Sequence, residues 1–198
     1  MKEDVIVIKC DSYERDEIQA ALLKIFSLAG IKKNAFDKIL FKPNMLSARL
    51  PEDGVTTHPQ ILEEAILFFQ SSKKIIGDSP ANSLKPIPLY WDKCGFKEVS
   101  EKTGVDLVKF DTSFFVTVVT DKGEMQVPVT PFIKDFSIIN LAKLKTHGLT
   151  ILTGAMKNLY GLIPGYHKSL LHSKFITPWE FSGFLADYYH EVSKYLSF

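Results

Sequence analysis

Short apolar runs alternate with segments of helical periodicity in the first part of the chain. The runs Val5–Cys10, Lys38–Lys42 and Lys74–Ile76 are apolar on both faces and rich in β-branched residues, which is typical of strands buried in a parallel sheet. Between them, the segments Ile18–Ala29 and Leu62–Phe69 place apolar residues at helical spacing. The order strand, helix, strand, helix, strand predicts an α/β fold, with a mostly parallel open sheet covered by helices on both faces.

Residues suited to helix ends flank both predicted helices. Asp11 or Ser12 can cap the first helix, and Gly30 is placed to end it. Pro59 fits the first position of the second helix, because its missing N–H would be unpaired there in any case.

The second half of the chain departs from the alternating pattern. The segments 115–120 and 125–129 predict an antiparallel hairpin near 115–129, with a turn at Asp121–Gly123. Strands are also expected at 107–110 and 136–140, and a helix from about Thr150. A final helix would present Phe181, Leu185, Tyr188 and Val192 at helical spacing. We expect a single α/β domain over residues 1–198. Because the chain stops after an amphipathic helix with no strand behind it, we expect it to be a fragment of a longer protein.

The composition is that of an ordinary folded protein, with 45% hydrophobic and 24% charged residues. A net charge of +1 gives no reason to expect nucleic acid or an anionic membrane as partner. The chain has two cysteines, Cys10 and Cys94, so it cannot ligate a four-cysteine iron–sulfur cluster or an all-cysteine zinc ion. With no signal peptide and no membrane-spanning run, a cytoplasmic location is expected.

Polar residues gather where three predicted strands end. These segments are Lys42–Asn44, Gly77–Pro80 and Asn140–His147. Ligands of open α/β sheets bind beyond the carboxyl ends of the strands, so the three segments predict one shared site. The alternative is that Asn, Asp, Ser and Pro only form turns here.

A basic block follows in the sequence. No acidic residue occurs between Asp135 and Glu180, and five lysines give this block a charge of +5. The remainder of the chain carries a charge of −4. Such a local positive field in a near-neutral protein favours a small anionic ligand, while a solvated lysine face is the alternative. A helix is predicted from about Thr150, and one side of it would carry Thr150, Thr153 and Lys157. The backbone N–H groups of Thr146–Gly148, just before this helix, would be free to hold a phosphate or a carboxylate.

Several motifs together resemble the domain of unknown function 362 family. They are Lys42-Pro-Asn44, Thr56-Thr57-x-Pro59, Gly77-Asp-Ser-Pro80, Ile139-Asn-Leu-Ala-Lys-Leu-Lys-Thr-His147, Thr153-Gly-Ala-Met-Lys-Asn-Leu-Tyr-Gly161 and Lys168-x-x-x-His172. The resemblance implies an α/β domain that often precedes a ferredoxin-type iron–sulfur segment and normally continues beyond the point where this chain ends. It supplies a site pattern and no established reaction, and this chain lacks the cluster-binding cysteines.

We therefore expect an enzyme core that binds a small anionic substrate or cofactor in a lysine-rich pocket, with a redox link through a ferredoxin-type partner implied by the resemblance alone. Asp78, Lys145 and His147 are the candidates for catalysis, and a desolvated lysine could serve as nucleophile. The candidates for ligand binding are Lys42, Asn44, Thr56, Thr57, Ser79, Asn140, Lys143, Thr153, Lys157, Asn158, Lys168 and His172.

Two other functions stay open at this point. One is a non-catalytic docking module for an iron–sulfur electron-transfer partner. The other is a metal-dependent enzyme that uses Asp78, His147 and His172 as ligands. The sequence leaves open whether the protein is an enzyme and which cofactor it binds.

Overall fold

A four-stranded parallel sheet forms the centre of the molecule, in the strand order β3-β2-β1-β6. The computed structural model describes residues 5–80, 86–165 and 167–196. The sheet strands are β1 (Lys38–Pro43), β2 (Lys73–Gly77), β3 (Asp106–Val108) and β6 (Ser137–Leu141). All three neighbouring pairs run parallel, with Leu40 opposite both Ile75 and Ile138. This confirms the predicted α/β class.

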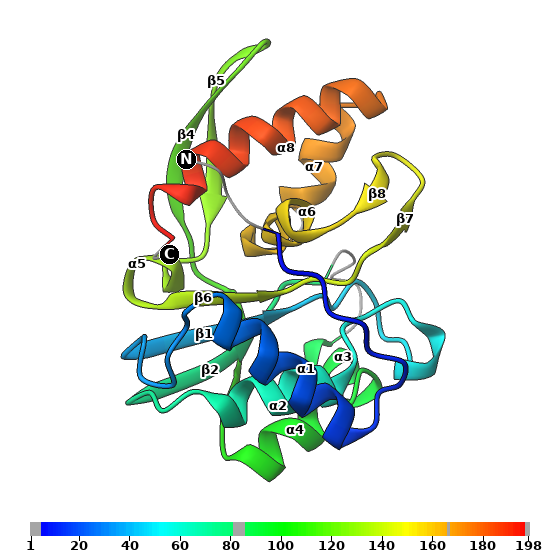
Figure 1. The fold of residues 1–198 in the computed structure, drawn as a ribbon. Coiled ribbons are helices and arrows are strands. Elements are labelled where there is room, and N and C mark those ends of the chain that lie inside the picture. Colours follow the sequence, from blue (N-terminus) through cyan, green and yellow to red (C-terminus); the bar gives the residue numbers. More distant parts are fainter. Residues whose placement is uncertain (1–4, 81–85, 166, 197–198) are drawn as a thin grey trace.

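Helices cover one face of the sheet. They are α1 (Arg15–Leu28), α2 (Pro59–Phe68), α3 (Ile87–Lys93) and α4 (Phe96–Thr103), with the short helix η1 (Pro51–Asp53) beside them, and they lie below the sheet in Figure 1. Ile39, Phe41 and Ile76 point from the strands into the apolar core on this side. His58 caps α2 by accepting the N–H of Gln60, and Pro59 occupies the first turn as predicted.

The opposite face carries the second half of the chain. Its elements are β4 (Phe114–Thr120), β5 (Gly123–Val129), α5 (Phe132–Asp135), β7 (Lys145–His147), β8 (Ile151–Thr153), α6 (Ala155–Leu159), η2 (Tyr160–Leu162), α7 (His167–Lys174) and α8 (Pro178–Ser193). The hairpin β4–β5 lies above the sheet beside α8 (Figure 1), which confirms the hairpin expected near 115–129. Phe181, Leu185 and Tyr188 of α8 are buried in the core on this side, as their spacing predicted. Thr177 and Glu180 form a capping box that fixes where α8 begins.

The predicted strand Val5–Cys10 is wrong. Within the described residues the segment pairs with no strand, and the side chains of Val5 and Val7 are 87% and 84% exposed. A β-branched run favours extended backbone, but a strand also needs a neighbour that donates and accepts hydrogen bonds. The cap predicted for the first helix is also different, because Glu14 precedes α1, and Ser12 instead accepts the N–H of Glu14.

The long helix predicted from Thr150 is also wrong. Residues 151–153 form β8, which pairs with β7, and α6 begins only at Ala155 and has five residues. Two glycines and several β-branched residues between His147 and Ala155 weaken helix formation there. The N–H groups of Leu149 and Thr150 donate to His147 Nδ1, so they are not free to hold an anion.

No helix in the described part of the chain combines the length and the apolar character that a membrane span needs.

Candidate functional site

The carboxyl ends of the central strands bring the first group of site residues together. Lys42 lies in β1 opposite Asn140 of β6, Asn44 follows β1, and Asp78 follows β2. Lys42 Nζ donates to Asp78 Oδ1 at 2.6 Å, and the second carboxylate oxygen of Asp78 accepts the N–H of Met45 at 2.8 Å. Burial lowers the pKa of Lys42, while the carboxylate of Asp78 opposes this effect. Both oxygens of Asp78 are therefore occupied by partners from β1 and the loop behind it.

Gly161 lies directly against this ion pair. A Cβ atom at this position would overlap Asp78 Oδ1 and lie 2.6 Å from Lys42 Nζ. The absence of a side chain at Gly161 is what lets η2 pack over the end of the sheet.

Three asparagine side chains connect the strand ends to α6. Asn44 Nδ2 donates to Asn158 Oδ1 at 3.0 Å, and Asn158 Nδ2 donates to Asn140 Oδ1 at 2.7 Å. Asn140 Nδ2 in turn donates to the carbonyl oxygen of Ala155, and Lys145 Nζ donates to Asn44 Oδ1 at 2.6 Å. Because this chain of hydrogen bonds joins β1, β6, β7 and α6, it fixes where the side chains of α6 point.

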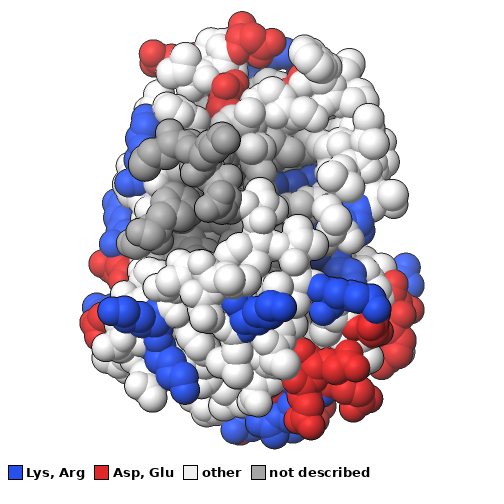
Figure 2. All heavy atoms as spheres, viewed as in Figure 1, with Lys and Arg blue, Asp and Glu red and all other residues white. Residues whose placement is uncertain are grey.

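A cavity of about 110 Å³ opens above this network. Eight of the fifteen predicted site residues line it: Asn44, Asp78, Ser79, His147, Lys157, Asn158, Lys168 and His172. Figure 2 shows Lys or Arg atoms lying below the surrounding uncharged surface in the upper half of the molecule. The structure thus places residues from the loops after β1 and β2, and from β7, α6 and α7, around one hollow.

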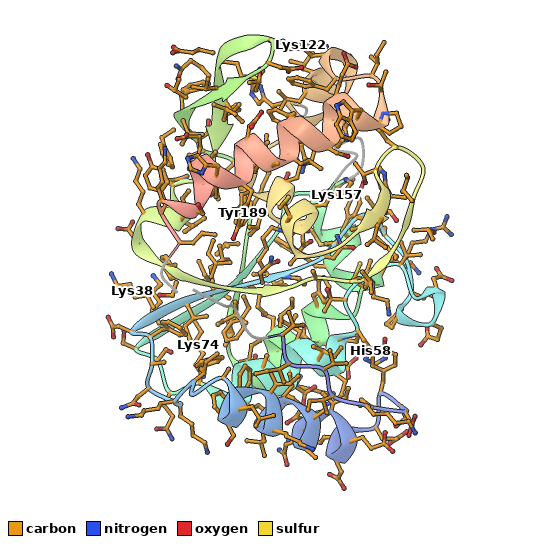
Figure 3. The ribbon with its side chains drawn as sticks, turned by 45° about the horizontal axis from the view of Figure 1, so that its top comes forward. Lys38, His58, Lys74, Lys122, Lys157 and Tyr189 are labelled. Carbon is orange, nitrogen blue, oxygen red and sulfur yellow. The ribbon has the colours of Figure 1, made fainter. Side chains whose placement is uncertain are left out.

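The lysines of the hollow have few acidic neighbours. Lys157 lies between α6 and α8 (Figure 3), and its Nζ is 5.6 Å from the ring centroids of both Tyr160 and Phe181. Lys168 is buried, and its Nζ donates to the carbonyl oxygen of Ser79 at 2.5 Å. Burial lowers the pKa of Lys157 to about 8 and that of Lys168 to about 7, and repulsion between neighbouring lysines adds to both shifts.

Both histidines of the cavity are held neutral. His147 Nδ1 accepts two backbone N–H groups, so the proton of the neutral ring is on Nε2. Burial and the charges of Lys157 and Lys145 lower the pKa of His147. His172 stacks on Phe181 with 4.1 Å between ring centroids, and burial lowers its pKa to about 4. At neutral pH the cavity therefore contains two uncharged imidazoles beside its lysines.

Seven predicted residues lie outside the cavity wall. Four of them support the wall from behind: Lys42, Thr57, Asn140 and Lys145. Thr57 Oγ1 accepts the N–H of Asn44, and the other three form hydrogen bonds with the wall residues Asp78, Asn158 and Asn44, respectively. Lys145 also donates to the carbonyl oxygen of Val55, and burial lowers its pKa to about 8.

The remaining three predicted residues lie further from the wall. Lys143 turns away to the hydroxyl of Tyr13, 2.8 Å from its Nζ. Thr56 and Thr153 are buried, and within the described residues their hydroxyl oxygens have no hydrogen-bond partner.

Four wall residues were missed by the sequence reasoning. They are Leu46, Tyr160, Gly161 and Ser169. Tyr160 and Gly161 end the motif that begins at Thr153, so the motif itself was the available signal. Tyr160 donates its hydroxyl to the carbonyl oxygen of Lys168 at 2.7 Å and so helps to hold α7 in place.

The proposed metal ligands do not form a metal site. Among the described residues, no group of three or more His, Cys, Asp or Glu side chains is placed to hold a metal ion. Asp78 already binds Lys42 and Met45, and His147 Nδ1 is also occupied. Cys94 is buried, and burial raises the pKa of its thiol.

The fold and site define an α/β domain with a lysine-lined cavity at the carboxyl edge of its sheet. The chain belongs to the family described as "Domain of unknown function (DUF362)", whose model matches residues 39–198. It is similar to the thylakoid-associated protein sll1697 of Synechocystis sp., with 26% identity over 178 residues, which covers 87% of this chain and 54% of the relative. The chain thus spans about half the length of that relative. No solved structure matches the chain.

Proposed function

We propose that this domain binds a small phosphate- or carboxylate-bearing molecule in the lysine-lined cavity, as the substrate site of an enzyme. The observation that carries the proposal is the imbalance of charge at the cavity. Lys157 and Lys168 line it, and the one carboxylate among its described wall residues, that of Asp78, is already paired with Lys42. A bound anion would supply the counter-charge that these lysines lack.

The lowered lysine pKa values support the same proposal. Each value lies below that of a free lysine because the charged form is desolvated and repelled by its neighbours. An anion in the cavity would favour the charged forms, so binding would take up protons near neutral pH. We therefore expect the affinity for an anion to fall as the pH rises from 6 to 8.5.

The histidines suggest what the site does with its ligand. His147 lines the cavity and carries its proton on Nε2, so this N–H is the group of the ring that can donate to a ligand oxygen. His172 is neutral at pH 7, because burial lowers its pKa to about 4, so its ring can accept a hydrogen bond from a ligand. A ligand held by the lysines would thus lie beside a hydrogen-bond donor and a hydrogen-bond acceptor, which would orient it as an enzyme orients its substrate.

The concave placement of the lysines also bears on the docking alternative. A docking module for an electron-transfer protein would present its lysines on a convex, solvated face. Here Lys168 is 4% exposed and Lys157 lies in the wall of a hollow, which favours a small ligand. A redox link through a ferredoxin-type partner remains a prediction from the family resemblance.

Calorimetric titration with inorganic phosphate at constant ionic strength tests the proposal. We expect saturable binding at pH 6.5 that weakens by about tenfold or more in Lys157→Ala, since a charged hydrogen bond contributes about 1.5–3 kcal/mol. Lys38→Ala is the matched control, because Lys38 is exposed at the opposite end of β1 (Figure 3). Equal affinities in all three proteins would refute the proposed site.

A further inference from the structure

Four lysines line the cavity or support its wall from behind: Lys42, Lys145, Lys157 and Lys168. Lys42 is paired with Asp78 at 2.6 Å, and Lys145 is bonded to Asn44 at 2.6 Å behind the wall. Lys157 lies over two aromatic rings at the side of the cavity. These three amines position other groups or supply charge.

The fourth lysine, Lys168, has a different environment. Its side chain is 4% exposed, lines the cavity, and donates to the carbonyl oxygen of Ser79 at 2.5 Å. Among the described residues, no carboxylate lies within ion-pair distance of its Nζ. The hydroxyl of Tyr160 fixes its backbone carbonyl. An amine is therefore held at the cavity wall without a direct counter-charge.

Burial also makes this amine available as a nucleophile. Burial lowers the pKa of Lys168 to about 7. The charge of Asp78 opposes this shift, and the charges of Lys42 and Lys157 add to it. About half of the Lys168 amines are then neutral at pH 7, a fraction on the order of a thousandfold higher than in an exposed lysine. Only the neutral amine has the free electron pair that attacks an electrophile.

We propose that Lys168 forms an imine with a small carboxylate-bearing aldehyde or ketone, the class of 2-oxo acids, held in this cavity. The inference rests on the proposed function, since the carboxylate is the anion that the cavity would bind, with Lys157, the other lysine of the described cavity wall, as its cationic partner. Lys168 Nζ adds to the carbonyl carbon, and the carbonyl oxygen leaves as water together with the two amine hydrogens. A C=N bond replaces the C=O bond, and no oxidant or reductant is consumed.

Reductive trapping tests the inference on the intact chain. The protein is incubated with pyruvate and cyanoborohydride at pH 7, and the labelled lysines are identified by peptide mass mapping. We expect one carboxyethyl group on Lys168, formed at least about tenfold faster than on exposed Lys38. Lys168→Arg should lose this label because a guanidinium stays protonated. Lys157→Ala should form it more slowly, and hydroxyacetone, a ketone without a carboxylate, should label Lys168 poorly.

Equal labelling of surface lysines, or labelling of Lys157 in place of Lys168, would overturn the inference. The wild-type peptide map reports this directly, so the test does not depend on whether a variant folds. Ligand-observed NMR with pyruvate separates the two levels of the proposal. Binding without a label on Lys168 would reject the imine and keep the anion site, whereas absence of both pyruvate and phosphate binding would reject the proposed function itself.

Discussion

Replacement of Lys168 by methionine should remove a large part of the pH dependence of stability. The pKa of Lys168 is about 7 in the folded protein and close to 10.4 in the unfolded chain. Between these values the unfolded chain binds more protons than the folded protein. Stability should therefore rise with pH in this window and fall as the pH drops towards 6. Lys168→Met removes the titrating group while keeping most of the apolar side chain.

The size of the effect follows from the difference between the numbers of protons bound by the unfolded chain and by the folded protein. Integrated from pH 6 to 8.5, Lys168 alone contributes about 2 kcal/mol to the gain in the free energy of unfolding. The side chain is only 4% exposed, so solvent screening reduces this figure little. For a chain of this length, the gain corresponds to a rise of about 4–8 °C in Tm.

Urea unfolding at pH 6 and pH 8.5, without phosphate, measures the difference. We expect the wild type and the control Lys38→Met to gain stability with pH, and Lys168→Met to gain about 2 kcal/mol less than either. The lost bond to Ser79 O lowers stability at both pH values and so leaves this difference unchanged. Equal pH dependence in all three proteins would refute the desolvation of Lys168.

Three further outcomes are expected. Gly161→Ala should lower the free energy of unfolding in the same urea assay by about 3–5 kcal/mol, because its Cβ would disrupt the buried pair of Lys42 and Asp78. The control is Gly183→Ala in α8, which should be neutral or stabilising because the new Cβ would meet no other part of the structure within 4 Å. Val7→Ser should change stability by less than about 0.5 kcal/mol, and a larger loss would mean that the exposed placement of Val7 is wrong. Phosphate affinity, measured by calorimetry, should fall at least about tenfold between pH 6 and 8.5 as the cavity lysines lose protons, and a constant affinity would contradict this coupling.

The strand ends were predictable because each depends on local sequence. The apolar runs before Pro43 and Gly77 form β1 and β2, and parallel pairing then brings the residues that follow them to one edge. The convergence of Asn44 and Asp78 thus follows from fold class alone.

Contacts between segments that are far apart in the sequence could not be predicted from local sequence patterns. Val5–Cys10 has the composition of a strand, but in the described structure it does not join a sheet and its valines are exposed. Asn44 and Asn158 are bonded although 114 positions separate them, and no spacing rule indicates such a pair. Likewise, Lys143 and Lys157 belong to the same basic block, yet only Lys157 lines the cavity.

Crystals soaked in selenate give the most direct test of the lysine-lined cavity as an anion site. Selenate resembles phosphate in shape and charge, and its selenium atom can be located by anomalous diffraction. The expected result is one anomalous peak in the cavity, with selenate oxygens within hydrogen-bond distance of Lys157 and Lys168, and no such peak in Lys157→Ala crystals. A cavity without anomalous density in the wild type, at concentrations that label other sites on the molecule, would contradict the account.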